Sequence, residues 1–177
     1  QLHTRGDRLA FSNGIIALAG AVCLGGLVLV LITTQPHEGG VLDPSAFRAH
    51  LMVERAALLW FGAAVVMVGV QAATDAGVSV TRMLTEGGLG AGIGASETAR
   101  AWIVVAIAAA IIAVFSRLTV RWEWHVPLLI PAVVGVVAVP VTGGAGEGPD
   151  HDYATSAVIV FAIAVSVWAG LRVVAAV

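Results

Sequence analysis

Five long apolar stretches, joined by short polar connections, make up most of this chain of 177 residues. They cover residues 9–32, 55–74, 99–118, 124–141 and 153–174. A helix rises about 1.5 Å per residue, so roughly 20 apolar residues cross a hydrocarbon core about 30 Å thick. Each stretch meets or nearly meets that length. The sequence therefore predicts an all-α fold, a polytopic transmembrane bundle of about five spans that forms one membrane domain over residues 1–177.

The composition excludes the ordinary soluble classes. Hydrophobic residues make up 59% of the chain and charged residues 11%, whereas a soluble domain carries about 25% charged residues. The net charge of −2 offers no basic surface for nucleic acid. A single cysteine, Cys23, excludes an internal disulfide framework. The expected partner is the lipid bilayer.

The first stretch is expected to remain in the mature protein. Arg5 and Arg8 precede it as they would precede a signal peptide, but the apolar run Gly14–Ile32 is longer than a typical signal core. Residues 33–35 are also a poor cleavage site. Because the chain begins at Gln1, we expect a processed protein or the N-terminal part of a longer one.

Several residues predict where helices begin. Asp43 and Pro44 favour a start there, with aspartate as the cap and proline in the first turn. Ser96 is expected to cap the third long helix, and Asp152 the fifth. Pro131 is expected to kink the fourth.

Small residues predict where helices pack together, and tryptophans predict which positions lie at the membrane interface. Two stripes of small side chains recur every four residues, a spacing that lets helices approach closely in lipid: Ala17, Ala21, Gly25 and Ala162, Ser166, Gly170. Four tryptophans near span ends predict an aromatic belt: Trp102, Trp122, Trp124 and Trp168.

The connection 75–97 is the longest. Its apolar segment 78–84 predicts a short interfacial helix, and the glycine-rich segment 87–94 predicts a flexible turn rather than a nucleotide site. Arg117 and Arg121 in the third connection place it in the cytoplasm by the positive-inside rule, which puts the N-terminus outside. Arg5 and Arg8 favour the opposite orientation.

Polar residues in the second helix are the densest candidates for chemistry. His50 and Glu54 share one face, and Arg55 adjoins them. They predict either an interfacial ion pair or a proton or ion relay. At the other end of this helix, a stripe is expected to be a packing face that ends in a solvated carboxylate: Met67, Gln71 and Asp75.

Other polar groups lie at span ends. Segment 147–152 places one imidazole, that of His151, beside three carboxylates, which predicts either a weak divalent-ion site or a turn with a helix cap. His125 is expected to be interfacial. Because no nucleophile–base arrangement or haem-binding histidine pair is evident, we do not expect an enzyme.

Parts of the chain resemble the copper resistance protein D family. The turn 142–145, the Asp150-His151 segment and the stretch Phe161–Gly170, with Ser166, Trp168 and Gly170, carry the likeness. Segments 47–55 and 95–102 are similar to actinobacterial members, some of which are fused to a cytochrome c oxidase copper-assembly domain. The two motif histidines of the family are Gly144 and Phe161 here.

The resemblance implies copper transport or copper supply to an oxidase at the cytoplasmic membrane. Copper is then the expected cofactor or cargo, and its candidate ligands are His50, Met52, Glu54 and His151. The alternative is a non-catalytic accessory subunit that packs against other membrane subunits or the rest of a longer chain. A third alternative is a proton-coupled carrier that uses Glu54 and Asp75.

Overall fold

The computed structural model describes residues 2–33, 40–142 and 151–176, with the side chains of residues 2–13, 45, 151 and 152 outside this description. Its long helices are α1 (Leu2–Thr33), α2 (Pro44–Asp75), α5 (Glu97–Leu118), α6 (His125–Ala138) and α7 (His151–Ala175). The short ones are α3 (Val80–Thr85), α4 (Leu89–Ala95) and the 3₁₀ turns η1 (Trp122–Trp124) and η2 (Pro140–Thr142). The predicted all-α class is confirmed.

Within the described residues, five helical segments are long and apolar enough to cross a membrane. They are Gly14–Thr33, Ala46–Asp75, Glu97–Leu118, Trp122–Thr142 and Tyr153–Ala175. The chain is therefore a multi-pass membrane protein, as the five apolar stretches predicted.

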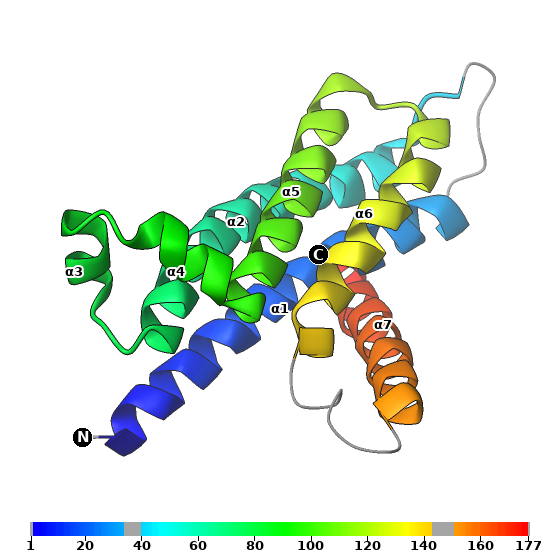
Figure 1. The fold of residues 1–177 in the computed structure, drawn as a ribbon. Coiled ribbons are helices and arrows are strands. Elements are labelled where there is room, and N and C mark those ends of the chain that lie inside the picture. The colour runs from blue at the N-terminus through cyan, green and yellow to red at the C-terminus, as the bar shows by residue number, and fades with distance from the viewer. Residues whose placement is uncertain (1, 34–39, 143–150, 177) are drawn as a thin grey trace.

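The α2 and α5 helices pack along most of their length, and α1 packs against both α2 and α7 (Figure 1). The α6 helix lies on α5 and α1 and has only a small contact with α7. The N-terminal ends of α2 and α6 meet at one end of the bundle, where an antiparallel bridge joins Val41 to Arg121. The opposite end carries the α3 and α4 helices and the start of α7.

Helix starts follow the sequence closely. The α2 helix begins at Pro44 with Asp43 at the N-cap position, but the Asp43 side chain makes no capping hydrogen bond, contrary to the prediction. Its carbonyl accepts a hydrogen bond from the Phe47 amide at 2.9 Å. Ser96 caps α5, because its Oγ accepts from the Ala99 amide at 3.0 Å. The prediction for Asp152 is off by two positions, since α7 already begins at His151 and Asp152 lies in its first turn.

The glycine-rich segment differs from its prediction. Residues 89–95 form α4 rather than a flexible turn. Glycine lowers helix propensity by about 1 kcal/mol per residue, but tertiary packing compensates here. At Gly92 a Cβ atom would lie 2.6 Å from the Met83 methyl, so the absence of a side chain lets α4 close on α3. The predicted short helix before it is confirmed as α3.

Close approach between α1 and α7 is confirmed at one end of the predicted stripes. Gly25 lies against the Gly170 backbone, and Gly170 in turn lies against the backbone of Ala21. Toward the N-terminal ends of both helices the stripes separate. There Ala17, Ala162 and Ser166 line a cavity instead of packing together.

One tryptophan occupies the centre of the bundle. Trp60 is 2% exposed, and its ring fits between Gly20 of α1 and Gly135 of α6. A Cβ atom at either glycine would lie 2.6–2.7 Å from a ring carbon. The aromatic-belt prediction fails for Trp102, which is 5% exposed and packs in the core, whereas Trp124 and Trp168 are exposed.

Candidate functional site

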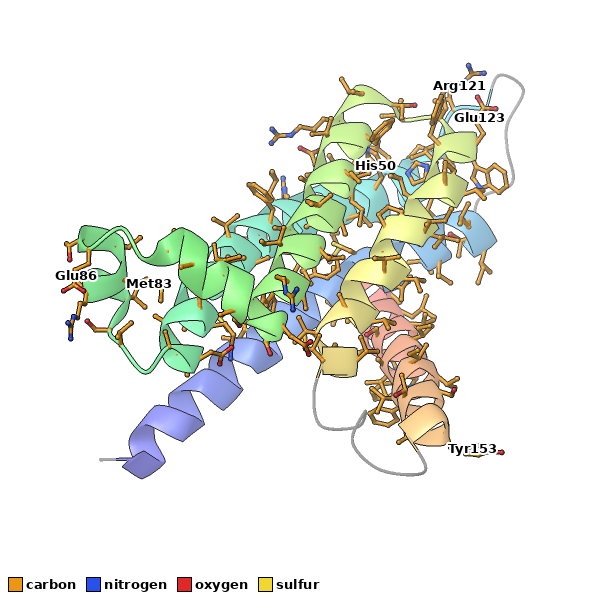
Figure 2. The ribbon with its side chains drawn as sticks, viewed as in Figure 1. His50, Met83, Glu86, Arg121, Glu123 and Tyr153 are labelled. Carbon is orange, nitrogen blue, oxygen red and sulfur yellow. The ribbon has the colours of Figure 1, made fainter. Side chains whose placement is uncertain are left out.

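Two buried histidines meet between α2 and α6. The Nδ1 atom of His50 lies 3.0 Å from the Nε2 atom of His125. Their residues are 2% and 1% exposed, and the rings contact edge to face with centroids 5.2 Å apart. Figure 2 places His50 at the end of the bundle where Arg121 and Glu123 also lie. The contact joins two residues that are 75 positions apart in the chain.

A backbone hydrogen bond sets the tautomer of His125. His125 Nδ1 lies 3.1 Å from the Arg121 carbonyl oxygen, which can only accept. His125 Nδ1 therefore carries a hydrogen. In the neutral ring its Nε2 atom then has a lone pair, which accepts from His50 Nδ1 when the His50 tautomer carries its hydrogen there. The pair thus holds the connection between α5 and α6 against the first turns of α2.

Two residues whose backbones contact the histidine rings, Ser116 and Trp122, have a buried polar side-chain atom without a hydrogen-bond partner in the described part of the chain. Ser116 contacts the His50 ring through its backbone, while its own Oγ is buried without a hydrogen-bond partner. The indole Nε1 of Trp122, three residues before His125, is buried in the same way. Such atoms are uncommon, because burying an unpaired polar group costs about 1–3 kcal/mol. A water molecule could pair with either atom, whereas a metal ion could not pair with the indole N–H, which only donates.

An ion pair closes the same end of the bundle. Arg117 Nε of α5 lies 2.7 Å from Glu54 Oε1 of α2. The sequence predicted an interfacial ion pair within α2, with Arg55 next to Glu54. The partner is instead Arg117, 63 residues away, because the α5 end packs beside α2.

The predicted copper ligands do not gather at one point. Met52 follows His50 by two positions, about 200° around the helix, and it packs against the apolar core. His151 starts α7 at the opposite end of the bundle, close to the labelled Tyr153, and its side chain lies outside the described residues (Figure 2). Glu54 shares the His50 face but is bound to Arg117. Within the described chain, no group of three His, Cys, Asp or Glu side chains is placed to hold a metal.

His125 is the residue that sequence reasoning missed. It was expected at the interface, but it is buried against His50. The order of the spans could have indicated the contact between these two histidines. In a five-span bundle the second and fourth helices start on the same side of the membrane, and each carries a histidine near its start. The length and apolarity of the spans could not show that the starts of these two helices are in contact.

The other stripe of α2, formed by Met67, Gln71 and Asp75, contributes to helix packing. Gln71 Nε2 donates to Asp75 Oδ1 at 2.9 Å, and Ser96 Oγ donates to Asp75 Oδ2. Met67 is buried, as a packing face requires, and Asp75 is exposed. Glu54 and Asp75 are separated by about 30 Å along α2, so they lie at opposite ends of the span.

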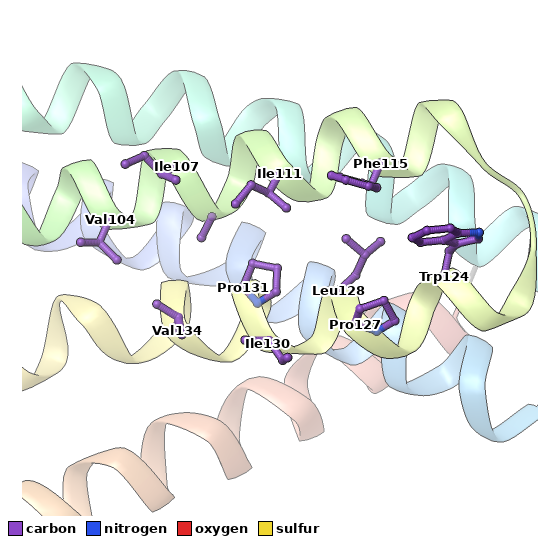
Figure 3. A pocket seen from close by; sticks show the side chains of 11 residues that line it. Val104, Ile107, Ile111, Phe115, Trp124, Pro127, Leu128, Ile130, Pro131 and Val134 are labelled. Carbon is purple, nitrogen blue, oxygen red and sulfur yellow. The ribbon is translucent and has the colours of Figure 1, made fainter.

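A groove of about 490 Å³ runs along the outer side of α5 and α6 (Figure 3). Phe115 and Trp124 stack at one end of it, with ring centroids 6.3 Å apart. Its lining is almost wholly apolar, and it includes Ile107, Ile111 and Pro131. Such a surface fits lipid acyl chains and offers no catalytic group.

Comparison with known proteins gives relatives but no function. Proteins of Mycobacterium bovis and Mycobacterium tuberculosis are each 52% identical to this chain over 160 residues, and one of Mycobacterium leprae is 49% identical. All three are named as uncharacterized proteins. Each match covers 90% of this chain but 24% of the relative, so the chain spans about a quarter of their length.

No protein-family model matches the chain. No solved structure matches it either.

Proposed function

We propose that this chain is a copper-handling module of the cytoplasmic membrane, similar to the copper resistance protein D family. In this role it moves copper or supplies it for oxidase assembly. The observation that supports the proposal best is the buried pair of His50 and His125, two imidazole nitrogens held 3.0 Å apart by different helices. Imidazole is a good copper ligand.

The distance between the rings is compatible with a shared ion. Metal–imidazole bonds are about 2.0 Å long, so one ion bound by both rings would hold their nitrogens at most about 4 Å apart. The rings need to separate by no more than about 1 Å from their present positions. The shared hydrogen would leave, because a ligating nitrogen must present its lone pair. The Ser116 backbone contacts the His50 ring, and the Oγ atom of the same residue is buried without a partner in the described chain.

In this proposal His50 and His125 replace the two motif histidines of the family, which are Gly144 and Phe161 in this chain. Phe161 of α7 is 69% exposed and offers no ligand atom. Gly144 lies outside the described residues. In this proposal a copper site is built from other residues, and α2 and α6 supply two imidazoles in direct contact.

Copper(I) titration of the purified protein against a chromophoric chelator tests the proposal. We expect one site per chain, with affinity reduced at least tenfold in His50→Ala and in His125→Ala. His151→Ala and Met52→Leu serve as matched controls and are expected to bind as the unchanged protein does. Absence of a stoichiometric site, or equal loss in the control variants, would overturn the assignment.

A second candidate is an accessory role in a larger membrane assembly, involving other subunits or the rest of a longer polypeptide. The α7 span is only 11% buried, and large apolar side chains such as Val160, Phe161 and Trp168 are exposed on it. The three mycobacterial relatives are about four times as long as the matched region. Cross-linking from cysteines placed at positions 160 and 168 in native membranes would test this role, and reaction with lipid alone would argue against it.

A further inference from the structure

A second site lies in the fork between α1 and α7. The two helices touch at Gly25 and Gly170 and diverge from there toward their N-terminal ends (Figure 1). The α6 helix, which has little contact with α7, covers one side of the fork. The space left between them is a cavity of about 420 Å³ that all five long helices line. Ligand pockets typically measure about 300–1,000 Å³.

The cavity has a rigid floor. The Trp60 ring is fixed between Gly20 and Gly135, whose missing side chains leave just enough room for it. Trp102 of α5 and Phe161 of α7 contribute two further aromatic rings to the lining. Planar rings bound against aromatic side chains are stabilised by ring stacking in addition to simple burial.

Two polar atoms distinguish this cavity from a lipid-filled gap. Both Trp60 and Ser166 line it, and neither side chain has a hydrogen-bond partner among the described residues. Trp60 offers an indole N–H and Ser166 a hydroxyl. In the middle of a membrane no water is at hand to pair with them, so an unpaired donor is costly. A ligand with a hydrogen-bond acceptor would satisfy them, whereas a hydrocarbon chain would not.

We propose that this cavity binds a membrane-soluble quinone. Its ring would lie against Trp60, with a carbonyl oxygen accepting from Trp60 Nε1 or Ser166 Oγ, and its isoprenoid tail would leave between α6 and α7. A quinone combines a planar ring, acceptor oxygens and an apolar tail, which are the three properties that the lining selects. The site lies apart from His50 and His125, so it is independent of copper binding.

The test uses the whole chain in nanodiscs and a radiolabelled naphthoquinone with a short isoprenoid tail. Empty nanodiscs give the background from partition into lipid. We expect saturable binding of one quinone per chain. Ala162→Phe should abolish it by filling the cavity, while Val160→Phe on the exposed side of the same helix should not change it.

The two polar contacts are tested separately. Trp60→Phe and Ser166→Ala are each expected to weaken binding about fivefold, since one hydrogen bond contributes about 1 kcal/mol. Trp168→Phe is the control for tryptophan replacement and should bind normally. Thermal unfolding of each variant verifies folding, and Ser166→Ala keeps the test valid if Trp60→Phe does not fold.

Three results would overturn the proposal. The first is uptake no higher than in empty nanodiscs. The second is equal binding by Ala162→Phe and the unchanged protein. The third is displacement of the quinone, with equal potency, by an isoprenoid hydrocarbon that lacks the ring, which would show that the cavity holds only an apolar chain.

Discussion

Gly25 of α1 and Gly170 of α7 lie so close that a Cβ atom added at Gly25 would be 2.5 Å from the Cα atom of Gly170. No real Cβ atom tolerates that separation from backbone. The two helices therefore depend on the absence of side chains at this crossing. It anchors α7, which has its main contact with α1.

Gly25→Ala is expected to destabilise the protein by about 1–3 kcal/mol, because backbone must shift to admit the methyl group. Thermal unfolding in detergent measures the effect. Gly62→Ala is the matched control, since a Cβ atom at Gly62 would meet nothing within 4 Å, and it should be neutral or slightly stabilising. Equal melting temperatures for both variants would contradict the observed crossing.

His50→Phe is expected to destabilise the protein by about 1–3 kcal/mol, because it leaves the buried Nε2 atom of His125 without a partner. Replacing both histidines by phenylalanine should cost less than the sum of the single replacements. A double-mutant cycle by chemical unfolding measures the coupling. Strict additivity would mean that the two rings do not interact.

Ser96→Ala is expected to cost about 1 kcal/mol, because it removes the cap of α5. It also removes the hydrogen bond to Asp75, which ties α5 to α2. Ser116→Ala, near the other end of α5, is the control. Its hydroxyl is buried without a partner in the described chain, so its loss should be neutral or stabilising. Hydrogen exchange at residues 97–101 should rise only in Ser96→Ala.

Glu54→Gln is expected to lower stability by no more than about 1 kcal/mol, since Arg117 is 58% exposed and solvent screens the ion pair. The effect should shrink in 1 M salt. Glu86→Gln, which breaks the more exposed pair with Arg82, should change stability still less. A larger loss in Glu86→Gln than in Glu54→Gln would contradict this order.

The sequence predicted the spans well because their length and apolarity are local properties. Pro44 and Ser96 marked their helix starts for the same reason, since capping and proline chemistry act within one turn. The glycine-rich segment was mispredicted because the contact that favours its helix, Gly92 on Met83, comes from another element.

The candidate site was only half visible in the sequence. His50 and Glu54 stood out by their spacing on one helix, but their real partners, His125 and Arg117, are 75 and 63 residues away. Such pairs depend on which helices are neighbours, and hydrophobic length says nothing about that. The cavity floor at Trp60 depends on two glycines in other helices, so it could not be predicted from the sequence either.

The length of α2 bears on how an ion could reach the histidines. Its 32 residues extend about 47 Å, against a hydrocarbon thickness of about 30 Å. Fitting this helix inside the hydrocarbon would need a tilt of about 50°, beyond the usual range of 0–40°. Part of α2 must then stand among the lipid headgroups, and the end with Arg48, Glu54 and Arg55 is the charged one. His50, six residues after Pro44, belongs to that end, so the histidine pair lies near the headgroups of the membrane rather than at its apolar centre.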